Sequence, residues 1–205
     1  MPTLGKTTFE LERLFRILNN AYFNDELPRP IITVQTSGKK PTLGWCSSDK
    51  RWKEGDKAAY YEINMSAEYL TRSNVEIVTT LLHEMVHLYC SQHNIKDTSR
   101  SGTYHNEKYR NAAETHGLTI TYNDKYGWHD STLANPDILD RLKVNRQAFK
   151  VARQAAQTQS GGKKSSSRKY TCPCCNLTVR ATKEVRIICA DCSARERDFI
   201  VLVES

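Results

Sequence analysis

A run of five residues, His83-Glu84-Met85-Val86-His87, contains side chains whose types and spacing suit hydrolysis at a metal ion. Residues four apart lie on one face of an α-helix, so His83 and His87 can bind the same ion, and Glu84 can reach a water bound to it. Zinc lowers the pKa of such a water from about 15.7 to about 7, and a carboxylate can accept its proton and pass it to a leaving amine. The run therefore predicts zinc-dependent hydrolysis at a carbonyl, with two histidine ligands and Glu84 as general base.

A catalytic zinc ion usually has three protein ligands, so one more residue must complete this site. His93 follows His87 by six residues, the separation found in metzincins, but Cys90 stands where that arrangement needs a glycine. An unbroken helix would carry His93 to another face. His105 follows a ten-residue connection that contains Gly102, and an antiparallel return can bring it over the first helix, so we favour His105 as the third ligand. Glu107 and Glu114 remain carboxylate alternatives, and His116 and His129 are expected at the surface or behind the ligands.

A second metal site is predicted near the C-terminus, where five of the seven cysteines cluster. Cys172 and Cys175 form one pair with two intervening residues, and Cys189 and Cys192 form another, thirteen residues further on. This spacing is typical of a zinc ribbon in which two tight turns present four thiolates to one ion. Four thiolates leave no place for water, so this zinc should be structural, and Cys174 should be a bystander.

The positive charge of the chain is concentrated in its C-terminal third. Residues 1–140 contain 16 lysines and arginines against 18 acidic residues, whereas residues 141–205 contain 14 against 5. A basic tail of this kind favours a polyanionic partner, DNA first, although a lysine-rich linker with solvated strand faces would have the same composition. The candidate nucleic-acid contacts are Lys163, Lys164, Arg168, Lys169, Arg180, Lys183 and Arg186.

The distribution of apolar residues predicts an α+β chain with two folded parts. Helices are expected over residues 7–23, with Thr7 and Glu10 as a capping box, and over 73–93, 104–116 and 136–157. Strands are expected over residues 31–35, 43–47 and 59–65, whereas 122–133 shows no clear period. The resulting domains are a metallopeptidase domain at 1–157, a flexible basic linker at 158–169 and a β zinc ribbon at 170–205.

Composition places the chain among ordinary globular proteins, with 39% hydrophobic and 26% charged residues. No segment approaches the roughly 20 apolar residues that a membrane span requires, so no membrane partner is expected. The N-terminus lacks the apolar core of a secretory signal. We therefore expect a cytoplasmic protein, associated with the nucleoid if it binds DNA.

Four sequence blocks resemble the SprT-like zinc metallopeptidase family, which includes the Spartan-related proteases of DNA–protein crosslink repair. The resemblance extends from about residue 8 to residue 133. It implies a zincin-like, mainly helical domain with a small β-sheet beside the metal helix, three histidine zinc ligands at His83, His87 and His105, and Glu84 as the base. It also implies proteolysis of proteins bound or crosslinked to DNA. The blocks are residues 14–28, Leu43-Gly44-Trp45, Glu62-Ile63-Asn64-Met65-Ser66, and residues 81–107.

Two other functions share much of this sequence evidence. A nucleic-acid-binding regulatory protein could use both zinc ions structurally without significant turnover, but a structural site needs no base, so Glu84 favours the enzyme. A peptidase independent of DNA would have the same site and differ only in its tail. Tyr104 and His116 are candidate donors to the oxyanion of a peptidase reaction.

Overall fold

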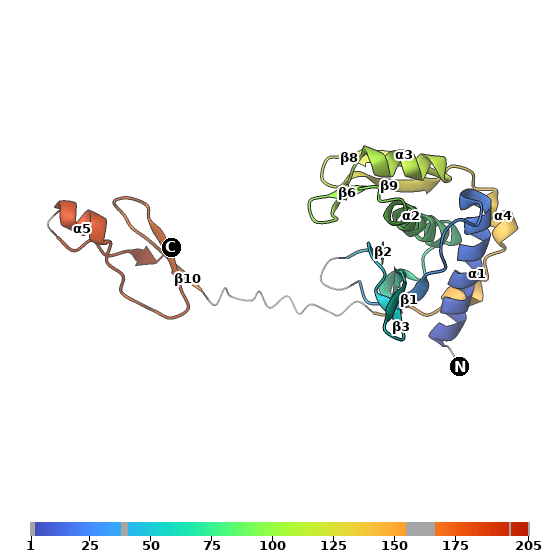
Figure 1. The fold of residues 1–205 in the computed structure, drawn as a ribbon. Coiled ribbons are helices and arrows are strands. Elements are labelled where there is room, and N and C mark those ends of the chain that lie inside the picture. The colour runs from blue at the N-terminus through green and yellow to red at the C-terminus, as the bar shows by residue number, and fades with distance from the viewer. Residues whose placement is uncertain (1–2, 38–40, 155–166, 197, 205) are drawn as a thin grey trace. The chain divides into compact units, whose positions relative to one another are not determined.

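The computed structural model describes residues 3–37, 41–154, 167–196 and 198–204. The chain divides into two compact units, residues 1–155 and 156–205, which are drawn in Figure 1. Most of the predicted linker, residues 158–166, lies outside the described residues, whereas residues 167–169 are described as part of the second unit.

The first helix, α1 (Leu4–Phe23), buries an apolar stripe at spacings of three and four, formed by Leu11, Leu14, Phe15 and Leu18. The predicted capping box at its start is wrong, because the helix begins three residues before Thr7. The Thr7 hydroxyl instead donates to the Ala148 carbonyl at 2.6 Å, deep in the core. This bond ties α1 to the end of the first unit.

The helix that carries the histidine pair, α2 (Asn74–Gln92), begins with a capping box formed by Ser73 and Glu76. The Ser73 hydroxyl accepts from the Glu76 amide at 3.3 Å, and the Ser73 amide donates to the Glu76 carboxylate at 2.9 Å. Apolar side chains are buried all along this helix, from Ile77 to Cys90. Figure 1 shows α2 in the interior of the first unit, so its central residues are held rigidly.

A three-stranded sheet packs against α2. It contains β1 (Ile31–Gln35), β5 (Glu62–Ser66) and β2 (Gly44–Cys46) in the order β1-β5-β2, with β1 parallel and β2 antiparallel to β5. The predicted strand over 59–65 is two strands, because β4 (Lys57–Tyr60) pairs with β3 (Trp52–Glu54) in a separate hairpin. The short strand β2 is the part of this sheet that lies nearest the metal helix.

A second sheet, in the order β6-β7-β9-β8, supplies the other wall of the first unit. Two of its strands, β6 (Thr98–Ser99) and β7 (Tyr104–His105), form a small hairpin. The other two, β8 (Leu118–Asn123) and β9 (Gly127–Leu133), form a long one in the region where the sequence shows no period. A register shift between Thr121 and Tyr122 interrupts the alternation of side chains, which explains why the strand pattern is hidden.

The expectation of a mainly helical fold is wrong, because the described residues are 36% helical and 26% strand. The predicted helix over 136–157 is reduced to α4 (Ile138–Leu142) and a 3-10 turn at Arg146–Phe149, with residues 155–157 outside the described chain. Lys143 ends α4 in a left-handed conformation (φ 44°), and Asn145 then caps the 3-10 turn. The α+β class is confirmed at this coarser level.

The third long helix, α3 (Glu107–Thr115), starts later than predicted because Asn106 caps it, accepting from the Lys108 amide at 2.8 Å. It ends two residues before Gly117, whose φ of 88° is left-handed. A Cβ at Gly117 would overlap the Tyr22 ring, so this turn brings α3 close to α1.

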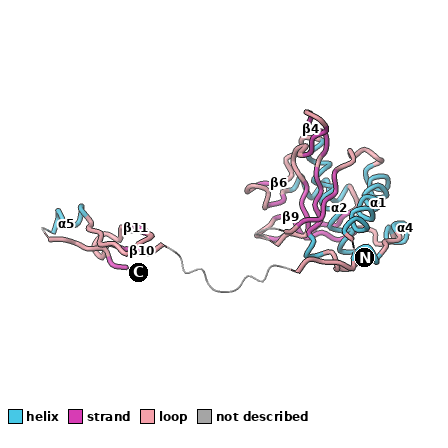
Figure 2. Tube along the Cα trace, turned by 90° about the horizontal axis from the view of Figure 1, so that it is seen from below, coloured by secondary structure: helices cyan, strands magenta, loops and turns pink. Residues whose placement is uncertain are grey.

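The second unit has a small sheet in the order β11-β10-β12, formed by β10 (Arg168–Thr171), β11 (Thr178–Ala181) and β12 (Val203–Glu204). The unit also contains the short helix α5 (Ala190–Glu196), which Figure 2 shows at the end of the unit beyond β10 and β11. Residues 185–188, in the middle of the predicted ribbon, form no strand and contribute only an isolated bridge from Ile188 to Val201. None of the helices in the described parts of the chain is long and apolar enough to cross a membrane.

Candidate metal sites

Three histidine side chains meet at one point of the first unit. His83 and His87 come from consecutive turns of α2, and His105 comes from β7. The Nε2 atom of His87 lies 3.2 Å from that of His83 and 3.1 Å from that of His105. Ligands of a tetrahedral zinc ion at about 2.0–2.1 Å lie about 3.3 Å apart, so these three nitrogens fit a zinc ion. The structure thus brings together the residues predicted as ligands.

Hydrogen bonds on the outer nitrogens orient two of the rings. The Nδ1 atom of His87 lies 2.6 Å from the Asp97 carboxylate, and that of His83 lies 2.9 Å from the Ser131 hydroxyl. A proton held on Nδ1 by such a partner leaves the Nε2 lone pair free for a metal. The Ser131 hydroxyl in turn donates to the His129 carbonyl at 3.2 Å. These partners select the tautomer that a ligand needs.

The ionisation of the three histidines differs with their partners. Burial, followed by the neighbouring imidazoles, lowers the pKa of His105 to about 3 and that of His83 well below its usual value. Burial also opposes protonation of His87, but its hydrogen bond to Asp97 and the charges of Glu84 and Asp97 raise its pKa overall. Two of the three imidazoles are therefore neutral across the physiological range, as metal ligands must be.

Glu84 lies in the same buried region, with only 5% of the residue exposed. Burial, the largest effect on this carboxyl, raises its pKa to about 7. The strand β2 passes so close that a Cβ at Gly44 would lie 3.2 Å from Glu84 and 2.8 Å from the Asn64 carbonyl. A buried carboxyl that is next to His83 in the sequence, feels the charge of His87 and has a pKa near neutrality has the acidity that a general base requires.

Comparison of the sequence with known protein families gives a match that includes the three histidines and Glu84. The sequence profile of the SprT-like family matches residues 11–125, more than half of the chain and a range that contains α2 and His105. The chain belongs to the SprT-like family. No curated protein and no solved structure matched it. The family resemblance inferred from the sequence is therefore confirmed, while β9 and the second unit lie beyond the matched residues.

The residues considered as alternative ligands of this SprT-like protein have other surroundings than the three histidines. His93 pairs with Glu26 at 2.6 Å. On α3, Glu107 is exposed and Glu114 pairs with Arg110 at 3.4 Å. None of these side chains joins the histidine cluster among the described residues.

The two candidate oxyanion donors also have other partners. The Tyr104 hydroxyl lies 3.2 Å from that of Tyr122. His116 stacks on Phe23 with ring centroids 4.4 Å apart. A residue expected behind the ligands is better placed: the His129 ring lies 5.2 Å from that of His105, and its side chain is 42% exposed. His129 can therefore reach both the site and the solvent.

Sequence reasoning missed three residues of the SprT-like site. They are Asp97, Ser131 and Tyr109, whose buried ring lies 4.5 to 4.9 Å from the three histidine rings. Tyr109 follows His105 by four residues, so a helical reading of 104–116 contained a signal for it. Asp97 and Ser131 lie in a loop and in an unrecognised strand, where spacing predicts nothing.

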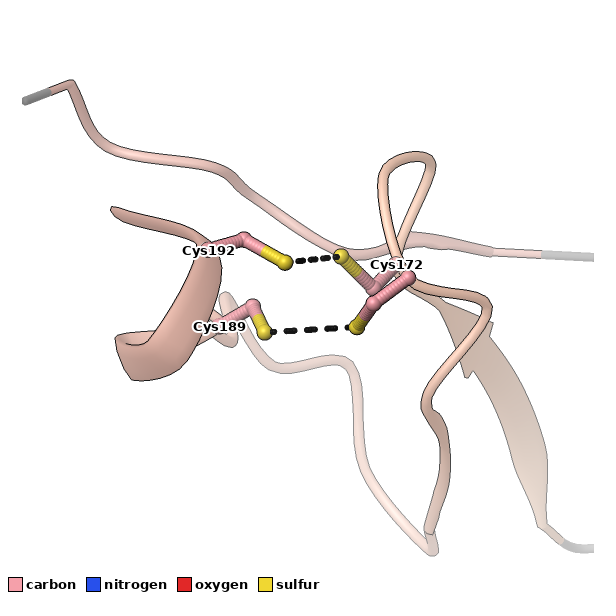
Figure 3. Close-up of side chains that lie close together, drawn as sticks. Cys172, Cys189 and Cys192 are labelled. Atoms are coloured by element: carbon pink, nitrogen blue, oxygen red, sulfur yellow. Dashed lines mark hydrogen bonds between the residues drawn. The ribbon is translucent and has the colours of Figure 1, made fainter. Parts of the chain in front are cut away.

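The four predicted ribbon cysteines also converge. The sulfur atoms of Cys172 and Cys192 are 3.9 Å apart and those of Cys175 and Cys189 are 3.7 Å apart. Figure 3 shows Cys189 and Cys192 pointing from the α5 side toward Cys172. Zinc–sulfur bonds of about 2.3 Å in a tetrahedron place sulfurs about 3.8 Å apart, so this set fits zinc. The backbone amide of Cys175 is the main cause that lowers the pKa of Cys172 to about 7. Cys174 is exposed and outside the four-sulfur set.

The predicted nucleic-acid contacts are only partly brought together. Lys163 and Lys164 lie outside the described residues. Lys169 and Arg180 are directly opposite on β10 and β11, so they share a face of the sheet. Arg168 pairs with Glu204 at 3.1 Å, which neutralises part of its charge. Lys183 and Arg186 are exposed in the segment before α5.

Proposed function

We propose that this SprT-like protein is a zinc metalloendopeptidase that hydrolyses peptide bonds of protein substrates. The observation that carries the proposal is Glu84, buried beside the three converging nitrogens of His83, His87 and His105. A structural zinc site has no need of a base at this position. The rival, a regulatory zinc protein without turnover, leaves Glu84 without a role.

In the proposed reaction, three histidines, Glu84 and His129 have separate roles. A zinc ion held by the three histidines would supply an acidic water and polarise the scissile carbonyl. Glu84 accepts the proton of the attacking water and returns it to the leaving nitrogen, a role suited to a pKa of about 7. In this proposal His129, which is partly exposed and whose ring lies 5.2 Å from that of His105, contacts the substrate carbonyl.

The substrate class that we propose is protein bound or crosslinked to DNA, with DNA held by the basic second unit. The support is the excess of nine lysines and arginines over five acidic residues in the second unit, residues 156–205, together with the Lys169–Arg180 face of the small sheet. In this proposal the ribbon zinc is structural, and the protein works in the cytoplasm at the nucleoid.

The test compares wild type with Glu84→Gln on a DNA-binding protein, with and without single-stranded and double-stranded DNA. The amide is nearly isosteric and cannot act as a base, so cleavage should fall by orders of magnitude while zinc content is unchanged. Glu107→Gln, an exposed change on α3, is the matched control and should cleave normally. Equal cleavage by wild type and Glu84→Gln would contradict the assignment, and no cleavage by wild type under any condition would favour the regulatory rival.

A further inference from the structure

Three arginines from two helices line an open, solvent-exposed cavity on the surface of the first unit, which none of the preceding functions uses. The cavity has a volume of about 480 Å³ and is lined by Arg13, Arg16, Ile17 and Asn20 of α1 and by Arg141 of α4. The α1 residues recur at helical spacing, so they form one face of that helix. Apart from the partly buried Ile17, every lining side chain carries hydrogen-bond donors.

Two of the guanidinium groups are held in place by the protein. Arg13 donates to both carboxylate oxygens of Glu10, at 2.9 and 2.7 Å, and to the Leu142 carbonyl at 2.7 Å. Arg141 donates to the side-chain carbonyl of Asn20 at 2.7 Å. Groups fixed in this way lose little conformational freedom when a ligand binds.

The charge at the cavity is only partly balanced. Glu10 is 4% exposed and is committed to Arg13 and to the Asn145 amide, which donates to it at 2.8 Å. The Asp25 carboxylate accepts a hydrogen bond from the Asn20 amide at 2.7 Å and is not one of the residues that line the cavity. Arg16 and Arg141 are exposed and line the cavity. Among the described residues, neither of these two cations forms an ion pair with a carboxylate.

We propose that this cavity is an anion site that binds phosphate groups. Guanidinium groups match the geometry of phosphate oxygens bidentately, and several at one concave site favour a dianion or a phosphodiester over a carboxylate. The same chemistry would bind a phosphate of a nucleic-acid backbone or a free phosphate compound. The site is separate from the histidine cluster and does not depend on the proposed peptidase activity.

The test uses the full chain and two probes, inorganic pyrophosphate and a short labelled single-stranded oligonucleotide. Arg16→Glu/Arg141→Glu should weaken pyrophosphate binding about 10-fold or more, measured by calorimetry, because two charge-assisted contacts are lost. The matched control is Lys53→Glu/Lys57→Glu, an equal change of charge on the exposed lysines of the β3–β4 hairpin, which should bind pyrophosphate as wild type does. Arg16→Gln, a single change at an exposed residue, keeps the test valid if the double variant unfolds.

The oligonucleotide distinguishes the two sources of phosphate. A loss of affinity for both probes in the cavity variant alone identifies the ligand as a nucleic-acid backbone. A loss for pyrophosphate alone identifies a free phosphate compound. The proposal is overturned if wild type does not bind pyrophosphate, or if cavity and control variants bind both probes equally well.

Discussion

At the scale of single residues, two of the three clustered histidines have a hydrogen-bond partner on their outer nitrogen. Asp97 lies 2.6 Å from His87, and Ser131 lies 2.9 Å from His83. Each partner holds a proton on the outer nitrogen, so the inner one can bind a metal. Asp97 is therefore a positioning residue that acts through His87.

Replacing this carboxylate should weaken metal binding without disturbing the fold. We expect Asp97→Asn to lower zinc affinity by about 10- to 100-fold, because the amide keeps the shape of the side chain but loses the charge that favours the ligand tautomer of His87. Competition with a chelator measures the affinity, and Asp56→Asn, an exposed change in the β3–β4 turn, is the control. Equal affinities in the two variants would show that Asp97 has no role in orienting His87.

At the scale of elements, β2 packs closely against α2 at Glu84, the proposed base. Gly44 lies where any side chain would meet the Asn64 carbonyl and Glu84. Gly44→Ala should therefore destabilise the protein by about 1–3 kcal/mol and displace Glu84, so cleavage should fall more than zinc content. Thermal unfolding and metal analysis measure the two effects. Gly5→Ala, at the open start of α1, should be neutral or slightly stabilising, and a similar result for Gly44→Ala would refute the packing argument.

The elements also show how far sequence reasoning reaches. The histidine helix α2 was predictable because its period, its Ser73 cap and its metal motif agree. The β8–β9 hairpin was not, because a register shift and exposed polar residues break its alternation. His105, the proposed third ligand, was predictable from the sequence, but its secondary structure was not. It was assigned to a helix, whereas it lies in β7 and the helix starts only after the Asn106 cap. Local periodicity identifies elements well and their tertiary pairings poorly.

At the scale of the whole molecule, we expect the first unit to contain the peptidase site and the second unit to bind DNA. The full chain should bind about two zinc ions and a 1–157 truncation about one, because each unit has its own ligand set. The truncation should also lose most of the DNA affinity, and the DNA affinity of the full chain should fall steeply between about 50 and about 200 mM salt. Elemental analysis and salt titration measure both. A single zinc ion in both proteins would refute the ribbon site, and equal, salt-independent DNA binding would refute the role of the tail.

The hairpin that carries β6 and β7 has a consequence for the metal-free protein. Asp97 precedes this hairpin and His105 ends it, and Asn106 ties the two together by donating to the carbonyls of Asp97 and Lys96 at 3.0 and 2.8 Å. An ion bound to His87 and His105 therefore bridges this surface loop to the buried helix α2. Removing the ion removes a cross-link within one domain, so amide exchange with solvent should quicken in the loop and stay slow in α2. We therefore expect loss of zinc to loosen this hairpin while the interior of the unit stays folded.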